Sequence, residues 1–398
     1  MKPVVIPLLV TAIGSGFVND PNLVSAQTWT QTSAPTTNWT SIASSADGKK
    51  LVAAASNIWV SSDSGITWTQ TGAPTLGWQA VACSADGMNL VAVGYLTPPL
   101  LGVVYTSTNS GVTWTSNNVP NVPWKFVISS ADGSILGALT SQGVFYTSAD
   151  AGADWIANSL PSGTWFAATT SADGSTFVVS GLVGICISTN SGTSWTLTNS
   201  LFEATTIAAS ASANRLVAVT GGSIYTSTNS GFAWTQTTAP VTNWASVASS
   251  ADGVRLVAVA GAPRYIRYPP PPILPGGPIY TSRDSGLTWV SNNVPSQLWS
   301  CVASSADGTK LFAAVSSGGI WTSQSTPAPQ MNITPTNGNL ALSWIIPSTN
   351  LVLQQNSDLS TTNWTDVSNT PVLNFTNLQD EVTLPLTNGS GFYRLATP

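Results

Sequence analysis

The sequence predicts an all-β fold built from one repeated unit, and three observations lead to this prediction. The pattern S-x-[DN]-x-G-x-x-W occurs six times at intervals of 39 to 55 residues, which is typical of propellers, solenoids and repeat arrays. A second pattern, W-x7-D-G, also occurs six times. Beyond the N-terminus, β-branched residues alternate with small polar ones, without helical periodicity. The copies of the first pattern begin at Ser61, Ser107, Ser148, Ser188, Ser227 and Ser282.

The first pattern, which we call the box, has the chemistry of a tight hairpin turn. Glycine at its fifth position tolerates a positive φ. The Asp or Asn at its third position can accept hydrogen bonds from the turn's own backbone, and the final Trp buries a large apolar surface. We therefore expect a structural role for the third-position residues, which are Asp63, Asn109, Asp150, Asn190, Asn229 and Asp284.

Each repeat divides into four strands. The first runs from the Trp of the second pattern to an Asp-Gly hairpin turn, and the second has the form L-V-A-V-A. The third enters the box and the fourth leaves it. A degenerate copy, in which Ala204, Ser212 and Ala213 replace Trp, Asp and Gly, brings the repeats to seven. Four antiparallel strands repeated seven times predict a seven-bladed β-propeller.

The two ends of the repeat region predict that the last blade is split. Residues 28–35 match the fourth strand of a repeat, whereas residues 318–326 match a third strand, after which the box pattern fails. Pairing these ends would close the ring and remove exposed strand edges. We therefore assign residues 27–326 to the propeller. Residues 327–338 are expected to be a linker, and residues 339–398 a small β-sandwich-like module.

Composition limits the classes of function. Only 7% of the 398 residues are charged, with 16 acidic, 11 basic and no His residues. The net charge of −5 disfavours nucleic acid or an anionic membrane as a partner, and the lack of His removes the commonest general base and metal ligand. We expect no metal and no cofactor, and we expect Cys83, Cys186 and Cys301 to be small buried apolar residues.

Residues 1–26 have the features of a secretory signal peptide. Lys2 supplies the positive charge, residues 4–18 are apolar, and residues 24–26 form a small-residue cleavage site. The apolar run is broken by Pro7 and is short for a membrane span; an uncleaved anchor is the alternative. We expect a monomeric mature protein without a membrane span, secreted or held in the cell envelope.

The box and its copies resemble the Asp-box (BNR) repeat superfamily, which includes sialidases, sortilin-type receptors, xyloglucan-cleaving glycosidases and the photosystem II stability-factor propellers. The resemblance covers residues 28–326. It implies the propeller fold, with the boxes away from the face that binds ligands. It does not imply one function, because a fold of this kind hosts many.

The acidic residues argue against a glycosidase. Such enzymes need two carboxylates flanking one bond, or a Tyr activated by a carboxylate. Turn chemistry accounts for nine propeller Asp residues, which leaves Asp154 and Glu203. Asp154 lies between a third and a fourth strand, Glu203 lies between two repeats, and these connections are on opposite faces. The arginine-containing segment that sialidases carry early in the chain is also missing, so we expect a non-enzyme.

Two connections between second and third strands are enlarged, and both are expected on the face opposite the boxes. They comprise residues 94–102 and 261–277. Arg and Tyr are enriched in recognition hot spots, and the second connection ends in a run of prolines that favours extended polyproline structure. A solvated insertion without a ligand is the alternative. We predict a binding surface formed by Arg264, Tyr265, Arg267, Tyr268 and Tyr95.

These arguments favour a secreted, non-catalytic propeller that binds an extracellular protein or glycan, or serves as a scaffold. A glycoside hydrolase of the sialidase or xyloglucanase kind is one alternative. An assembly protein similar to the stability factors is another. The Trp residues that open the first strands are expected to pack between blades rather than to stack on sugars.

Overall fold

The structure is a computed structural model that describes residues 27–96, 101–198, 203–220, 222–261, 276–325, 331–336, 339–346, 351–357, 361–385 and 391–396. Within these ranges all regular structure is β. No helix among the described residues is long and apolar enough to cross a membrane. The proposed signal peptide, residues 1–26, lies outside the described residues.

Six four-stranded antiparallel sheets follow one another along the chain, and each is built from consecutive strands. The first sheet contains β2 (Ser41–Ser44), β3 (Leu51–Ala54), β4 (Ile58–Ser61) and β5 (Thr69–Gln70). The second contains β6 (Gly77–Cys83), β7 (Leu90–Leu96), β8 (Leu101–Ser107) and β9 (Thr115–Ser116). The third contains β10 (Trp124–Ser129), β11 (Leu136–Thr140), β12 (Phe145–Ser148) and β13 (Ile156–Asn158). The fourth contains β14 (Trp165–Thr170), β15 (Phe177–Gly181), β16 (Gly184–Ser188) and β17 (Thr196–Thr198). The fifth contains β18 (Ala204–Ala209), β19 (Leu216–Thr220), β20 (Ser223–Ser227) and β21 (Thr235–Gln236). The sixth contains β22 (Trp244–Ser249), β23 (Leu256–Ala260), β24 (Ile279–Ser282) and β25 (Val290–Ser291).

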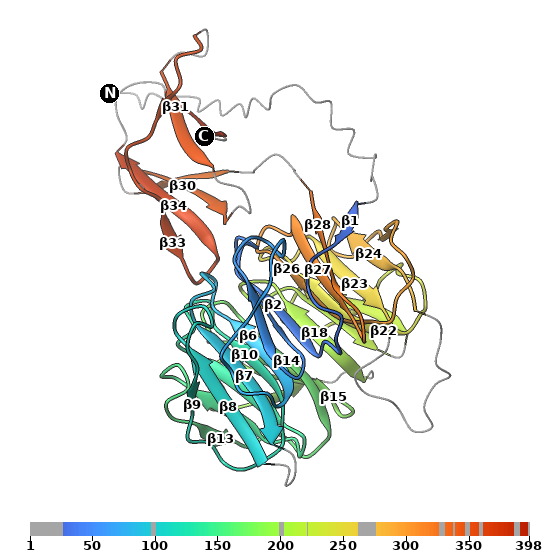
Figure 1. Cartoon of the computed structure of the whole chain (residues 1–398). Coiled ribbons are helices and arrows are strands. Elements are labelled where there is room, and N and C mark those ends of the chain that lie inside the picture. The colour runs from blue at the N-terminus through green and yellow to red at the C-terminus, as the bar shows by residue number, and fades with distance from the viewer. Residues whose placement is uncertain are drawn as a thin grey trace.

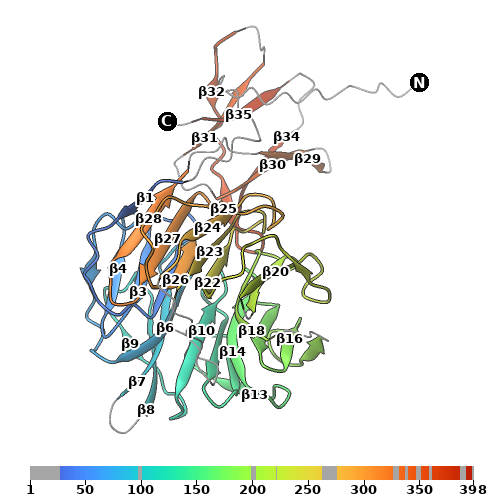
Figure 2. The ribbon, with the colours of Figure 1, turned by 90° about the vertical axis from the view of Figure 1, so that its right-hand side faces the viewer.

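A seventh four-stranded sheet joins the two ends of this region. It contains β26 (Trp299–Ser304), β27 (Lys310–Val315), β28 (Ile320–Gln324) and the N-terminal strand β1 (Trp29–Gln31), in the order β1-β28-β27-β26. Strand β1 pairs antiparallel with β28, with Trp29 opposite Ser323. The sheets stand around a common centre, which is the arrangement of a β-propeller (Figures 1 and 2).

The second strand of each sheet forms the centre of the core. All residues of β3, β11, β15, β19, β23 and β27 are buried. The apolar clusters run from one sheet into the next, as in the cluster that contains Ala53, Cys301 and Phe312. A strand packed on both sides by neighbouring sheets buries both of its faces, so it has an uninterrupted apolar sequence such as Leu-Val-Ala-Val-Ala rather than an alternating one.

The first strands end in a closed ring of hydrogen bonds around the axis. The alanine before each Asp-Gly turn, or before the Ser212-Ala213 turn of the degenerate repeat, donates its N–H to the carbonyl of the corresponding alanine in the next sheet, over 2.6 to 2.8 Å. The order is Ala46, Ala85, Ala131, Ala172, Ala211, Ala251, Ala306 and back to Ala46. Each sheet gives one hydrogen bond and accepts one, so the backbone of the ring is satisfied without side chains.

The degenerate repeat keeps the turn with different residues. Ala213 replaces the turn glycine and has a φ of 53°, in the left-handed region that glycine normally fills. The Ser210 hydroxyl donates to Asn214 Oδ1 at 3.1 Å, in place of the Asp that accepts this bond elsewhere. Strands β18 and β19 therefore pair normally, although the sequence pattern is lost.

The C-terminal residues form a second unit with two sheets. One has the order β29-β30-β34-β33, and the other the order β32-β31-β35. Leu340, Leu342 and Leu353, from both sheets, share one apolar cluster, so the unit is a small sandwich. The strands are β29 (Asn332–Thr336), β30 (Asn339–Ile345), β31 (Val352–Asn356), β32 (Thr365–Asp366), β33 (Val372–Asn374), β34 (Gln379–Pro385) and β35 (Phe392–Ala396).

One expected boundary is wrong. The segment 327–338, expected to be a linker, contains β29, which pairs with β30 from Asn332 to Thr336. Its Pro and Asn residues favour a loop on the sequence alone, but β29 is the edge strand of its sheet, and edge strands tolerate Pro. We call the unit from Met331 onward the module.

The pairing of β1 with β28 makes stability depend on the N-terminal strand. Trp29 is 6% exposed and packs against Val257, Val302 and Leu311. We expect Trp29→Ala to lower the free energy of unfolding by about 3 kcal/mol or more, because it leaves a large cavity. Denaturant titration measures this change. Thr30→Ala, an exposed position on the same strand, should have little effect, and equal values for both variants would contradict the pairing.

Candidate binding sites at the two ends of the axis

The boxes form hydrogen-bonded turns in which the acidic side chain is fully engaged. In the first box, Ser61 Oγ donates to Asp63 Oδ1 at 2.8 Å, and the Thr67 N–H and hydroxyl donate to the two carboxylate oxygens at 2.9 and 2.6 Å. Asn replaces Asp in three boxes with the same pattern, as at Asn109. These residues shape the turn, and the interchange of Asp and Asn indicates that charge is not required.

The box also contains a second left-handed residue that the sequence did not indicate. The fourth position, occupied by Ser or Ala, has φ between 54° and 62° in all six boxes, directly before the glycine. The serines serve as contacts between sheets: Lys310 Nζ donates to Ser64 Oγ at 2.9 Å, and Arg215 Nη1 donates to Ser285 Oγ at 2.6 Å. Several basic residues of the propeller therefore act as links between neighbouring sheets.

The Asp residues of the Asp-Gly turns are engaged in the same way. Each accepts a serine hydroxyl two residues earlier at 2.5 to 2.7 Å, and the backbone N–H two residues later at 2.9 to 3.0 Å. A carboxylate in this setting stabilises a turn and is poorly placed to act on a substrate. The residues are Asp47, Asp86, Asp132, Asp173, Asp252 and Asp307.

These hydrogen bonds lower the pKa of several carboxyl groups. Burial by itself raises the pKa of Asp132 and Asp173, but hydrogen bonds from neighbouring Ser residues outweigh burial and leave each pKa below its ordinary value. At Asp150 the backbone N–H of Asp154 is the main cause of a lowered pKa. The carboxyls of Asp63 and Asp284 also have a lowered pKa, because donors from the box outweigh their burial.

The two remaining acids lie at opposite ends of the strands. Asp154 is exposed and lies in the box between β12 and β13, whereas Glu203 directly precedes β18. We call the end with the Asp-Gly turns and boxes the turn face, and the opposite end the loop face. Asp154 belongs to the turn face and Glu203 to the loop face, so the two acids do not form a pair. No cluster of three His, Cys, Asp or Glu residues suited to a metal occurs within the described ranges.

Most of the predicted binding surface lies outside the described residues. This applies to Arg264, Tyr265, Arg267 and Tyr268, and their role stays a prediction. Tyr95 is half-buried on β7, which extends past the neighbouring sheets and pairs Tyr95 with Gly102 of β8. A Cβ added to Gly77 would lie 2.7 Å from the Tyr95 ring, so the ring covers this glycine.

The Trp residues that open the first strands are core residues. Trp39, Trp78, Trp124, Trp165, Trp244 and Trp299 are each at most 2% exposed. Several indole N–H groups donate to loop carbonyls, as Trp299 Nε1 does to Gly277 O at 2.8 Å. A sugar has no access to these buried rings, and their N–H groups hold the backbone of the connections at the loop face.

The axis is hollow near the loop face. A cavity of about 120 Å³ is lined by the early residues of the first strands, among them Phe126, Phe166, Thr205 and Ser300. Lys125 lies beside this cavity: its Nζ donates to Trp165 O at 3.1 Å and lies 4.9 Å from the centre of the Phe166 ring. Burial lowers the pKa of Lys125 to about 8. This end of the axis combines aromatic walls, hydroxyl groups and one cation.

The opposite end of the axis has a different lining. A hollow of about 180 Å³ is bordered by the Ser and Ala residues that end all seven first strands, with Cys83 at one position. One residue of the module, Leu378, also lines it. This end is therefore closed in part by the chain itself, and it repeats nearly the same residues around the axis.

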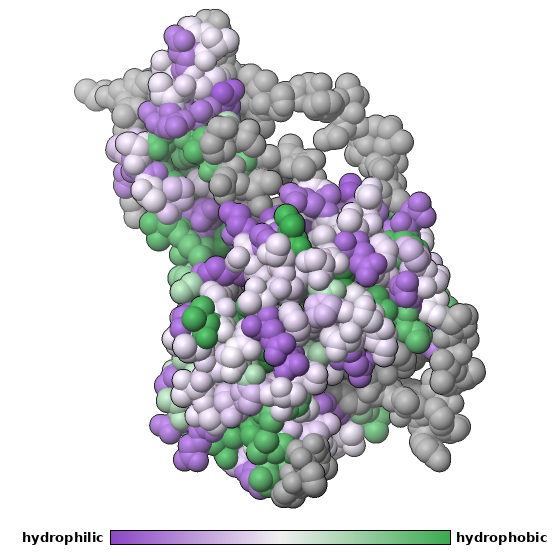
Figure 3. Space-filling model, viewed as in Figure 1, coloured by the Kyte–Doolittle hydropathy of each residue, from purple (hydrophilic) through white to green (hydrophobic). Residues whose placement is uncertain are grey.

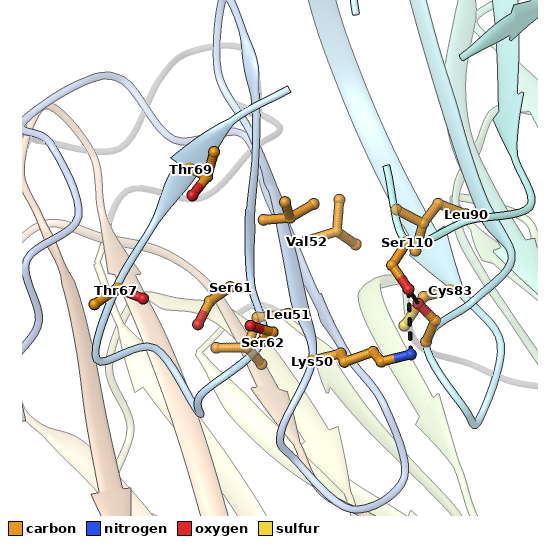
Figure 4. A pocket seen from close by; sticks show the side chains of 12 residues that line it. Lys50, Leu51, Val52, Ser61, Ser62, Thr67, Thr69, Cys83, Leu90 and Ser110 are labelled. Atoms are coloured by element: carbon orange, nitrogen blue, oxygen red, sulfur yellow. Dashed lines mark hydrogen bonds between the residues drawn. The ribbon is translucent and has the colours of Figure 1, made fainter. Parts of the chain in front are cut away.

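A third hollow, of about 110 Å³, lies between the first two sheets (Figure 4). Lys50 reaches across it, and its Nζ lies 3.2 Å from Ser110 Oγ and 3.0 Å from Met88 Sδ. Cys83 lines the same hollow, and burial, with a smaller contribution from Asp86, raises its pKa to about 12. The Lys50 ammonium group donates to the box serine Ser110, just as Lys310 donates to Ser64. We therefore interpret this hollow as a gap between neighbouring sheets.

On the side of the molecule that Figure 3 shows, hydrophilic and hydrophobic residues of the described surface are intermixed. The space-filling view shows a mostly pale surface with small, separate hydrophobic patches (Figure 3). The exposed apolar side chains include the sixth residue of four boxes, which are Ile66, Val112, Phe232 and Leu287. The described surface therefore directs attention to the two ends of the axis.

Comparisons with known proteins support the fold. No protein-family model and no curated protein matches the sequence. YCF48 from Cyanidioschyzon merolae has a TM-score of 0.57 at 16% identity over 75% of this chain and 99% of its own, and YCF48 bound to D1 peptide has a TM-score of 0.55 at 16% identity over 80% and 100%. The GH74 xyloglucanase from Xanthomonas campestris gives a TM-score of 0.58 at 15% identity over 80% of this chain and 59% of its own. A crystal structure of the mitotic checkpoint complex gives 0.60 at 14% identity over 82% and 99%.

These likenesses establish a β-propeller fold and no particular activity. The matched structures differ widely in what their descriptions say they do, and all are below 20% identical to this chain. A fold shared at this level carries no information about a site.

The lowered pKa values of the box carboxyls predict acid sensitivity. A carboxyl whose folded pKa lies below its unfolded value of about 3.9 stabilises the protein above that pH and loses this effect as pH falls through the folded pKa. We expect the triple variant Asp63→Asn, Asp150→Asn, Asp284→Asn to be nearly as stable as the parent at pH 7, and to lose less stability below about pH 4. Thermal unfolding across pH measures both effects.

The chain supplies a matched control for this experiment. The reverse triple variant, Asn109→Asp, Asn190→Asp, Asn229→Asp, places carboxylates in the other three boxes and should steepen the loss of stability in acid. If both triple variants follow the parent's pH profile, box carboxylates do not contribute as described.

The lowered pKa of Lys125 predicts a second rise of stability with pH, in a higher pH window than that of the carboxyls. Between the folded pKa of about 8 and the unfolded value of about 10.4, the unfolded chain retains a proton that the folded chain has lost. The free energy of unfolding therefore gains a rising contribution with pH in this window. Lys125→Met should remove that contribution, as measured by denaturant titration. Lys49→Met, at a side chain that is 44% exposed, should retain it, and a rise unchanged in Lys125→Met would contradict the assignment.

Proposed function

We propose that this chain is a secreted, non-catalytic, seven-bladed Asp-box propeller that binds an extracellular protein or glycan through its loop face. The observation that carries the proposal is the engagement of the acids. The Asp residues of the boxes and of the Asp-Gly turns accept hydrogen bonds from their own turns. The other two acids among the described residues of the seven sheets and their connections, Asp154 and Glu203, lie at opposite ends of the strands. A glycosidase requires two carboxyl groups about 5 to 10 Å apart around one bond.

The chemistry of the loop face supports binding there. The cavity lined by Phe126 and Phe166 has the apolar walls and few polar groups that are typical of binding sites. Lys125 supplies a cation at its side. The predicted surface of Arg264, Tyr265, Arg267 and Tyr268 falls in the sequence between β23 and β24, whose ends Ala260 and Ile279 are described and lie at this face. The identity of the partner follows from none of these features.

An assembly role of the stability-factor kind is a second candidate. The observation that favours it is the fold similarity to YCF48 bound to D1 peptide, which spans the full length of that chain. In both proposals the protein recognises a partner without transforming it. A hydrolase of the Asp-box kind remains the competing class, and Glu203 is the acid it would use on the loop face.

Capture of partners by the immobilised mature protein tests the proposal. We expect the double variant Arg264→Glu, Arg267→Glu to lose at least tenfold in partner binding, because Arg residues at hot spots often contribute 2 kcal/mol or more. Arg394→Glu, a change of the same kind in the module, is the control and should bind as the parent does. Retained binding in the double variant would place the partner elsewhere.

A separate assay addresses the enzymatic alternative. The mature protein is incubated with a panel of extracellular glycans, and released reducing ends are measured. We expect none above background. Activity that disappears in Glu203→Gln would show that the protein is a hydrolase and overturn the proposal.

A further inference from the structure

The turn-face end of the axis forms an apolar socket. Ala131, Ala172 and Ala211 form a buried cluster, with Ala85 and Ala251 packed against it. We call these five alanines the socket. They belong to the hydrogen-bonded ring, so their positions are fixed by the backbone of five sheets. Serine hydroxyls surround them, and each serine that precedes an Asp-Gly turn donates to its Asp, which leaves the methyl groups as the apolar surface.

One side chain of the module packs into this socket. Leu378 is the only residue outside the seven sheets' own repeats, among those the structure describes, that contacts the alanine cluster and lines the hollow of about 180 Å³. It lies at the tip of the hairpin β33–β34. Figures 1 and 2 show the module standing to one side of the ring, joined to it without a shared sheet.

The backbone of Leu378 is unusual for a leucine. Its φ is 56°, in the left-handed region, where Asn and Gly are common and a bulky residue is strained. The tip is held firmly: Leu378 N–H donates to Asn374 O at 2.9 Å, and Ile346 N–H donates to Leu378 O at 3.1 Å. Glu381 accepts from the side chains of Asn374 and Asn377 at 2.9 and 3.0 Å.

A turn selected only for its own stability would have Asn or Gly at this position. Strain retained at a rigid tip indicates that the side chain is needed for something outside the turn. Among the described residues, the contact of this kind that Leu378 makes is with the alanine socket. In the described parts of the chain, every sheet belongs wholly to the propeller or wholly to the module, so no strand pairing described there holds the two together.

We propose that Leu378 is a latch that docks the module on the propeller and closes the turn-face end of the axis. The occupant of the socket is the chain's own leucine. The latch covers the end of the axis where the sheets are alike and leaves the loop face open. This inference goes beyond the proposed function and does not depend on which partner binds there.

The test uses a variant that removes the side chain and relieves the backbone. Leu378→Asn suits the left-handed conformation, so the turn should form at least as well as in the parent. Loss of this partly buried leucine should reduce the ratio of docked to undocked module about tenfold. Small-angle scattering of the full mature chain should show a larger radius of gyration. Val372→Asn, at a residue 69% exposed on the same hairpin, is the control and should scatter as the parent does.

Hydrogen–deuterium exchange gives a local measure of the same event. In Leu378→Asn, amides in segments 129–133 and 170–174 should exchange faster, because water reaches the ring of alanines that Leu378 covers. Exchange in β27 and β23, whose residues are all buried in the core, should be unchanged, which verifies that the propeller is folded. Equal scattering and equal exchange in Leu378→Asn and Val372→Asn would overturn the latch.

Light scattering identifies the occupant. If Leu378 closes its own propeller, the parent and Leu378→Asn have the same monomer mass at all concentrations. A parent dimer that dissociates in Leu378→Asn would show that the leucine enters the socket of a second copy, and the intrachain latch would be wrong.

Discussion

The closed ring of backbone hydrogen bonds between seven alanines is the constraint on which the rest of the propeller depends. Each alanine donates to the next and accepts from the one before, at 2.6 to 2.8 Å, so the ring closes only with every sheet in place. First strands that lie this close together around the axis leave room for a methyl group and little more. The Ser-Ala-Asp-Gly sequence at the end of six of the seven first strands follows from this geometry, and so does the split sheet that joins β1 to β28.

The same constraint explains why the repeated Asp residues of the described turns are engaged by their own turns. A first strand that reaches the axis must turn back sharply, and Asp with Ser stabilises that turn by hydrogen bonds such as the one between Ser130 and Asp132. The box uses Asp or Asn to make the outer turn in the same way. Polar residues at these repeated positions therefore serve the fold, and the binding role that we propose depends on positions where the repeats differ.

Most of the fold could be predicted because repetition reports local structure seven times over. The strands, the turns and the split sheet follow from that pattern. Three features could not be predicted. Asn214, four residues after Ser210, accepts the hydrogen bond that a turn Asp accepts in the other repeats. The strand β29 forms because it pairs with β30, although its own sequence favours a loop. The contact of Leu378 joins positions far apart in sequence, and a single side chain leaves no periodic signal. A leucine between Asn377 and Gln379 in a polar turn was the one visible sign.

The two ends of the axis differ in a way that separates their roles. At the turn face each sheet contributes nearly the same small residues, since the ring permits no others, and an environment so uniform can be filled by one unspecific apolar side chain such as Leu378. At the loop face, the residue that follows the Trp at the start of a first strand differs from sheet to sheet. Lys125 and Phe166 are the most distinctive of these residues. Specific recognition requires different groups at different angles around a ligand, and this end of the axis is the one that provides them. A module latched on the turn face leaves that surface exposed, so the position of the module and the variation among the sheets favour the same face for a partner.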